Sequence, residues 1–76
     1  MVSNEKTLDF IVFCIEEYKN AKKLKGEEVY RIFDETGVID FLNENFSLLH
    51  TFGKEYVIDT IDEFIKNESE KRGFLF

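Results

Sequence analysis

The sequence contains no proline, one cysteine and one histidine, and each scarcity restricts structure or function. Proline breaks helices, so its absence leaves long helical stretches uninterrupted. Cys14 is the single cysteine, which excludes an internal disulfide bond, and its place in an apolar run predicts a small buried side chain. Metal sites require several His, Cys or carboxylate ligands at suitable spacing. We therefore expect no metal ion, and since no phosphate-binding glycine loop is present, we expect no other cofactor.

Groups suited to catalysis are equally scarce. His50 is the only imidazole, and Ser47 precedes it by three residues, so the two could touch on a helical turn. No third group or oxyanion hole accompanies them, and a capping or packing role explains His50 better. We expect a protein that is not an enzyme, and an enzyme that uses His50 is the third interpretation.

Long apolar runs and a separate basic face are also missing. No segment approaches the roughly 18 apolar residues of a membrane span, and Met1–Lys6 lack the apolar stretch of a signal peptide. We therefore expect a cytoplasmic protein that does not contact membranes. The net charge is −6, and acidic residues flank the four lysines between positions 19 and 25. An acidic domain repels phosphate backbones, so nucleic acid is not an expected partner.

Apolar residues recur at helical spacing along almost the whole chain. The spacing predicts helices over about residues 4–23, 27–36, 38–45 and 54–71, with a short turn that Ser47 could start before the last helix. Gly37 suits the left-handed position that ends a helix. No strand signal competes with this pattern. We predict an all-α fold, a small compact array of four to five helices, which forms a single helical domain over residues 1–76.

Twelve aromatic residues supply most of the bulk for a core. In the first helix the predicted apolar stripe combines Leu8, Ile11, Val12, Ile15 and Tyr18, and Phe10 and Cys14 widen it on one side. Five aromatic residues fall on the predicted core-facing side of their helices, so packing in the core explains their presence. They are Phe10, Tyr18, Phe33, Phe41 and Phe64.

Four aromatic residues do not fit this packing. Phe13 falls among acidic residues, Tyr56 lies off the stripe of the last helix, and Phe74 and Phe76 belong to an apolar end, Gly73–Phe76. Two interpretations of residues 73–76 remain open, since this tail could fold back on the core or dock elsewhere. Aromatic residues are enriched at protein interfaces, so these four are the candidate partner-binding residues.

Several segments together resemble a known family of short bacterial proteins, DUF3791, which is catalogued only as a domain of unknown function. They are residues 10–19, 26–30 with Phe33, 36–42, 49–51 with Gly53, 55–56 and 59–65. The resemblance implies an accessory or antitoxin-like partner of an ADP-ribosyltransferase-like protein. It transfers no catalytic or binding residue, and the tail lies outside it.

The leading hypothesis is a non-catalytic protein–protein interaction module, which binds a protein partner, such as a toxin-like neighbour, or forms a homodimer. The alternative is a helix-turn-helix-like transcriptional regulator built on residues 27–49. Its second helix, residues 39–45, carries two acids and neither Arg nor Lys, although a recognition helix normally supplies cations to DNA.

Overall fold

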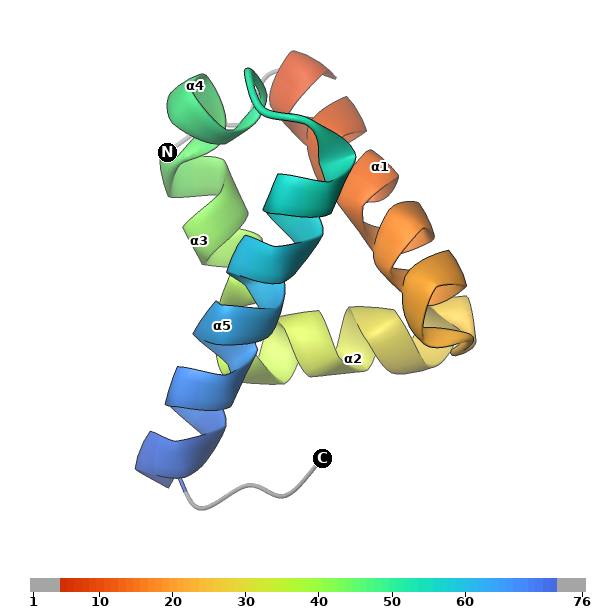
Figure 1. Cartoon of the computed structure of the whole chain (residues 1–76), viewed down its shortest axis with the longest axis vertical. Coiled ribbons are helices and arrows are strands. Elements are labelled where there is room, and N and C mark those ends of the chain that lie inside the picture. The colour runs from red at the N-terminus through yellow and green to blue at the C-terminus, as the bar shows by residue number, and fades with distance from the viewer. Residues whose placement is uncertain (1–4, 73–76) are drawn as a thin grey trace.

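The computed structural model describes residues 5–72, without the side chain of Arg72, and these residues form five helices and no strand (Figure 1). The all-α prediction is confirmed. The helix limits lie close to the predicted ones, and the turn expected near Ser47 is a helix of four residues. The helices are α1 (Glu5–Lys22), α2 (Gly26–Thr36), α3 (Val38–Glu44), α4 (Phe46–Leu49) and α5 (Lys54–Arg72).

Helix α1 packs against α2, α3 and α5, and α5 in turn contacts α2 and α3. In Figure 1, α2 runs across below α1, α5 descends past the end of α2 and continues below it, and α4 lies at the top beside the start of α1. Among residues 5–72, no helix combines the length and the hydropathy that a membrane crossing requires.

Local chemistry fixes where α2 begins and ends. The backbone N–H of Lys25 donates to Glu28 Oε1 at 3.0 Å, which satisfies one donor at the start of the helix. Gly37 has a left-handed backbone with φ +87°, and its N–H donates to the Phe33 carbonyl. A residue with a Cβ is strained in this conformation, so glycine is suited to turn the chain between α2 and α3.

The core combines side chains from every helix, and the aromatic residues predicted to pack do so. Tyr18 meets Phe33 edge-on with 5.3 Å between ring centroids, and Phe41 stacks on Phe64 at 4.5 Å. Phe10 is half-buried, and its ring lies 5.6 Å from that of Phe46 in α4. The buried apolar residues are Ile11, Cys14, Tyr18, Val29, Phe33, Val38, Leu42, Leu49, Val57, Ile61 and Ile65.

The predicted apolar stripe of α1 is confirmed for Ile11, Cys14 and Tyr18 and is wrong for Leu8 and Val12. The buried residues are Thr7, Ile11, Cys14 and Tyr18, whereas Leu8 and Val12 each leave 56% of their surface exposed. The apolar face of this helix spans nearly half its circumference, and only part of so wide a face can meet the core. The contacts of Tyr18 with α2 and α5 fix the rotation that leaves Leu8 and Val12 in solvent.

Candidate functional site

Several large apolar side chains are exposed on the surface of the described chain. Two of the predicted binding residues belong to this set, since Phe13 is 43% exposed and Tyr56 is exposed as well. Their exposure was expected from their helical phase, and their role in binding stays a prediction. Phe74 and Phe76 lie outside the described residues. The large exposed apolar residues are Leu8, Val12, Phe13, Tyr30, Leu48, Phe52 and Tyr56.

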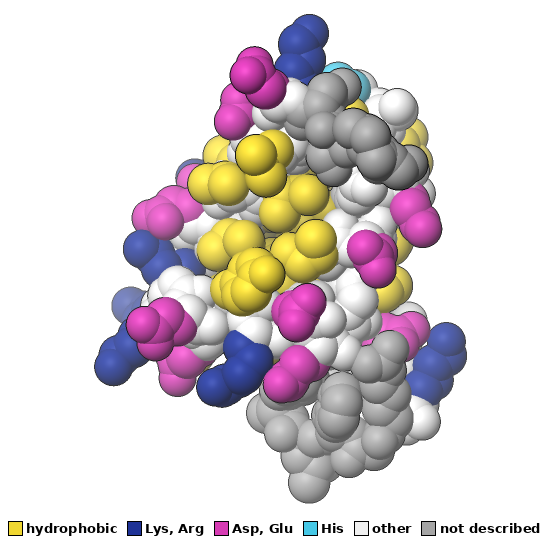
Figure 2. Space-filling view, turned by 180° about the vertical axis from the view of Figure 1, so that it is seen from behind, with side chains coloured by type: hydrophobic (Ala, Val, Ile, Leu, Met, Phe, Trp, Pro, Cys, Tyr) yellow, Lys and Arg dark blue, Asp and Glu magenta, His cyan; other side chains and the backbone are white. Residues whose placement is uncertain are grey.

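Leu8 and Val12 lie one turn apart on α1, and Ile15 follows on the same side, because residues spaced i, i+4 and i+7 share a helix face. We call these three residues the α1 apolar face. At about 100° per residue they point away from Glu17 and Ala21, which border α5. Figure 2 views the molecule from the side away from α5 and shows hydrophobic side chains gathered over the junction of α1, α2 and α3.

Acidic residues border the α1 apolar face on its solvent side. By helical phase, Glu5, Asp9 and Glu16 follow Leu8 and Val12 around the helix, and all three are exposed. Lys19 Nζ lies 3.0 Å from Glu16 Oε2 in an exposed ion pair. A surface of this kind, apolar with an acidic edge, suits an apolar partner that carries Lys or Arg at its rim.

Phe13 and Tyr56 lie on different helices, and their rings make no contact with each other within the described chain. Tyr56 pairs with Phe52, whose ring centroid is 4.5 Å away at a tilt of 45°. Phe52 lies in the connection before α5, and the sequence-based reasoning missed it. Its spacing of four residues from Tyr56 was the available signal.

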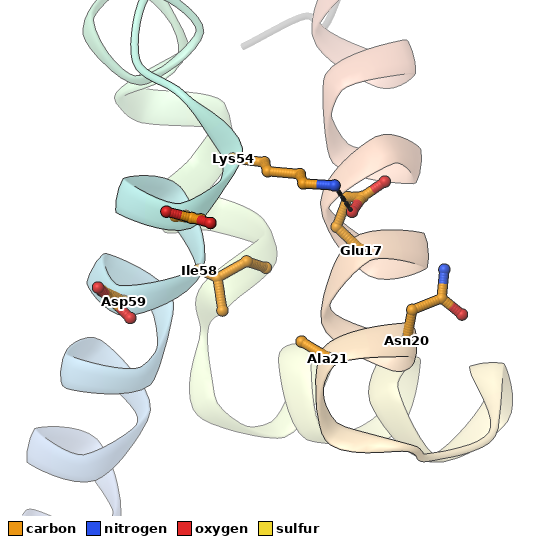
Figure 3. Close-up of a pocket in the computed structure, with 7 residues that line it drawn as sticks. Glu17, Asn20, Ala21, Lys54, Ile58 and Asp59 are labelled. Atoms are coloured by element: carbon orange, nitrogen blue, oxygen red, sulfur yellow. Dashed lines mark ion pairs between the residues drawn. The ribbon is translucent and has the colours of Figure 1, made fainter.

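A groove of about 330 Å³ separates α1 from α5 (Figure 3). Ala21 points from α1 toward α5, and Ile58 points from α5 toward α1, so these side chains form an apolar floor. Lys54 Nζ reaches across the groove to Glu17 Oε1 at 3.5 Å. The remaining lining residues are Asn20, Glu55 and Asp59.

Below this groove a polar cluster holds α1 against α5. The Tyr18 hydroxyl donates to Asp62 Oδ1 at 2.7 Å, and Lys22 Nζ lies 2.7 Å from Asp62 Oδ2. Burial raises the pKa of the Tyr18 phenol above its usual value, and the hydrogen bond to Asp62 and the charge of Asp62 raise it further. The neutral phenol therefore remains the donor in the folded protein.

Cys14 is fully buried in the core, as its sequence context predicts. Burial raises the pKa of its thiol to about 12, and the nearby charge of Glu17 acts in the same direction. Nucleophilic chemistry requires the thiolate, so Cys14 is inert in the folded state.

His50 is exposed at the end of α4. Its Nδ1 lies 2.7 Å from the Phe46 carbonyl, and its ring stacks on the Phe46 ring at 4.5 Å. An Nδ1–H tautomer donates to that carbonyl, which gives His50 a capping role of the kind expected from the sequence. Throughout residues 5–72, no three His, Cys, Asp or Glu side chains are close enough to share a metal ion.

Comparison with known proteins supports the family resemblance of the sequence. No curated protein and no solved structure matches the chain. A family model, described as a protein of unknown function, matches residues 9–68, which include Val12, Phe13, Tyr56 and the lining of the groove. Because this match covers most of the 76 residues, the chain belongs to the family of proteins of unknown function DUF3791.

Proposed function

We propose that this protein is a non-catalytic protein–protein interaction module and that the α1 apolar face is its contact surface. The observation that carries the proposal is the 56% exposure of both Leu8 and Val12, one turn apart on α1 and next to its buried side. Contiguous exposed apolar side chains rimmed by polar residues are typical of protein interaction sites. Phe13 lies on the same helix about 100° around from Val12, so it is outside this face.

The partner that fits this face is a protein with an apolar surface rimmed by Lys or Arg. The acidic border of the face, Glu5, Asp9 and Glu16, and the net charge of −6 favour encounter with a basic protein. Self-association through this face is less favourable, because the two acidic borders would approach each other. An accessory or antitoxin-like role beside an ADP-ribosyltransferase-like protein, as the family resemblance implies, would supply such a partner in the cytoplasm.

The alternative role as a transcriptional regulator receives no comparable support. Gly37 alone connects α2 to α3, and α3 contributes Asp40 and Glu44 but neither Lys nor Arg. Phosphate contacts at a recognition helix depend on such cations and on amides.

The experiment compares matched serine variants in binding to the protein encoded beside this one in its genome. After co-purification, both proteins are purified and their affinity is measured by calorimetry. The variant Leu8→Ser/Val12→Ser is expected to bind at least about ten-fold more weakly, because it removes two apolar contacts from the centre of the face.

Leu48→Ser is the matched control, because Leu48 is 58% exposed on another helix, α4, and is not part of the α1 apolar face. It is expected to change affinity by less than about two-fold. Unchanged binding by the double variant, with its helical circular dichroism intact, would remove this face from the proposal. Failure of the neighbouring protein to form any stoichiometric complex would contradict the antitoxin-like role.

A further inference from the structure

We infer that the groove between α1 and α5 is a second binding site and that it receives an arginine side chain from a protein partner. The groove lies on the other side of α1 from the α1 apolar face. The inference rests on the proposed function, because the arginine belongs to a protein partner. It adds a specific contact that can be tested separately.

The shape and floor of the groove suit a long side chain. Its volume of about 330 Å³ is at the small end of the range for ligand sites. Ala21 and Ile58 give it an apolar floor, against which the methylene stem of an arginine can pack while its charged end stays at the polar wall.

The residues that line the groove carry a net negative charge, which favours a cation. Three carboxylates and one ammonium group line the groove, so the lining has a net charge of −2. Lys54 is already paired with Glu17, and among the described residues neither Glu55 nor Asp59 forms an ion pair. Glu55 and Asp59 are spaced i, i+4 on α5, where like charges destabilise a helix. A guanidinium beside Glu55 relieves this repulsion and can donate to that carboxylate, whereas Asp59 points away from α1 and adds negative charge to the rim (Figure 3).

An exposed aromatic side chain, Phe13, lies one helical turn from the groove on α1. Phe13, Glu17 and Asn20 are spaced i, i+4 and i+7, so they share one face of α1, and the last two line the groove. A partner segment that places an arginine in the groove therefore meets Phe13 one turn away. Phe13 can contact the segment through its ring, which favours a protein segment over a free small cation.

The test uses short peptides as probes and does not depend on the identity of the partner. The ¹⁵N- and methyl-labelled protein is titrated with an acetylated, amidated Ala-Arg-Ala peptide, and with the same peptide carrying citrulline, which lacks the charge. Saturable shift changes are expected at Ala21 and Ile58 with the arginine peptide and not with the citrulline peptide. Higher salt is expected to weaken the binding.

Three variants separate the groove from general acidity. Glu55→Gln/Asp59→Asn is expected to weaken binding about three- to ten-fold through the loss of two negative charges. Ala21→Leu keeps every charge but fills the floor, and it is expected to abolish saturable binding while α1 stays helical. Glu63→Gln, an exposed acid of α5 that does not line the groove, is the matched control and should change affinity by less than two-fold.

Three outcomes overturn the inference, namely equal shifts with the citrulline peptide, full affinity in Ala21→Leu, or equal weakening by Glu63→Gln. Saturable binding of Mg²⁺ or spermidine without binding of the arginine peptide also overturns it, in favour of a small-cation site. None of these results affects the proposed function, which is measured with Leu8 and Val12 on the other side of α1.

Discussion

Neighbouring alanine substitutions in α1 test the rotation of this helix and therefore the existence of the α1 apolar face. Ile11 is 7% exposed in the core and Val12 is 56% exposed. Both are β-branched residues in the interior of the same helix, so their intrinsic helix propensities are similar. Ile11→Ala should destabilise the protein by about 2–5 kcal/mol, because it removes buried methyl groups and leaves a cavity.

The total stability of a chain of this size is about 4–11 kcal/mol, so Ile11→Ala removes a large share of it. Val12→Ala removes little buried surface and gains helix propensity, so its free energy of unfolding should change by less than about 0.5 kcal/mol. The midpoint of thermal unfolding should then fall by at least about 8 °C in the first variant and by less than about 4 °C in the second.

Urea and thermal unfolding, followed by circular dichroism at the helical band, measure both changes. The unfolding transitions of small domains of this kind are normally two-state, which allows the midpoints to be read as free energies. Equal destabilisation by the two variants, or a loss above about 1 kcal/mol in Val12→Ala, would place Val12 in the core and refute the rotation.

Three further predictions concern the backbone turn, the Tyr18 phenol and the buried thiol. Gly37→Ala should cost about 1–2 kcal/mol in urea unfolding, because φ is +87° and no neighbour lies within 4 Å of an added Cβ, so the strain is confined to the backbone. Because the folded pKa of Tyr18 is raised, stability is fully present below the unfolded pKa of about 10 and is lost as the pH rises above it. Tyr18→Phe should therefore show a flatter decline in urea stability above pH 10, and an unchanged slope would contradict the assignment to Tyr18. Cys14 should react with a thiol reagent at pH 8 only as fast as the protein unfolds, and rapid labelling of the native protein would show that the thiol is accessible.

Helix existence and helix limits were predictable from local chemistry. Gly37 follows directly after the last residue of the apolar stripe of α2, and glycine can adopt the positive φ that ends a helix. The end of α2 could therefore be predicted from this residue alone. The packing of Phe33 and Phe41 also followed from phase alone, because each belongs to a narrow apolar stripe.

The rotation of α1 was not predictable, because its apolar residues cover nearly half the helix. Ile11 and Val12 are adjacent, and their side chains differ by about 100° in direction, so either could lie at the centre of the buried side. The choice depends on Tyr18, whose hydroxyl reaches Asp62 across 44 positions of sequence. Long-range contacts of this kind carry no local sequence signal, and the groove between α1 and α5 was hidden for the same reason.

The most direct measurement of the central claim is the chemical-shift footprint of the purified protein partner on the ¹⁵N-labelled domain. If the α1 apolar face is the contact surface, the largest changes should fall on Leu8, Val12 and Ile15, and amides around Leu48 on α4 should remain unaffected. Changes centred on α4, or spread evenly over the surface without a maximum on α1, would contradict the account.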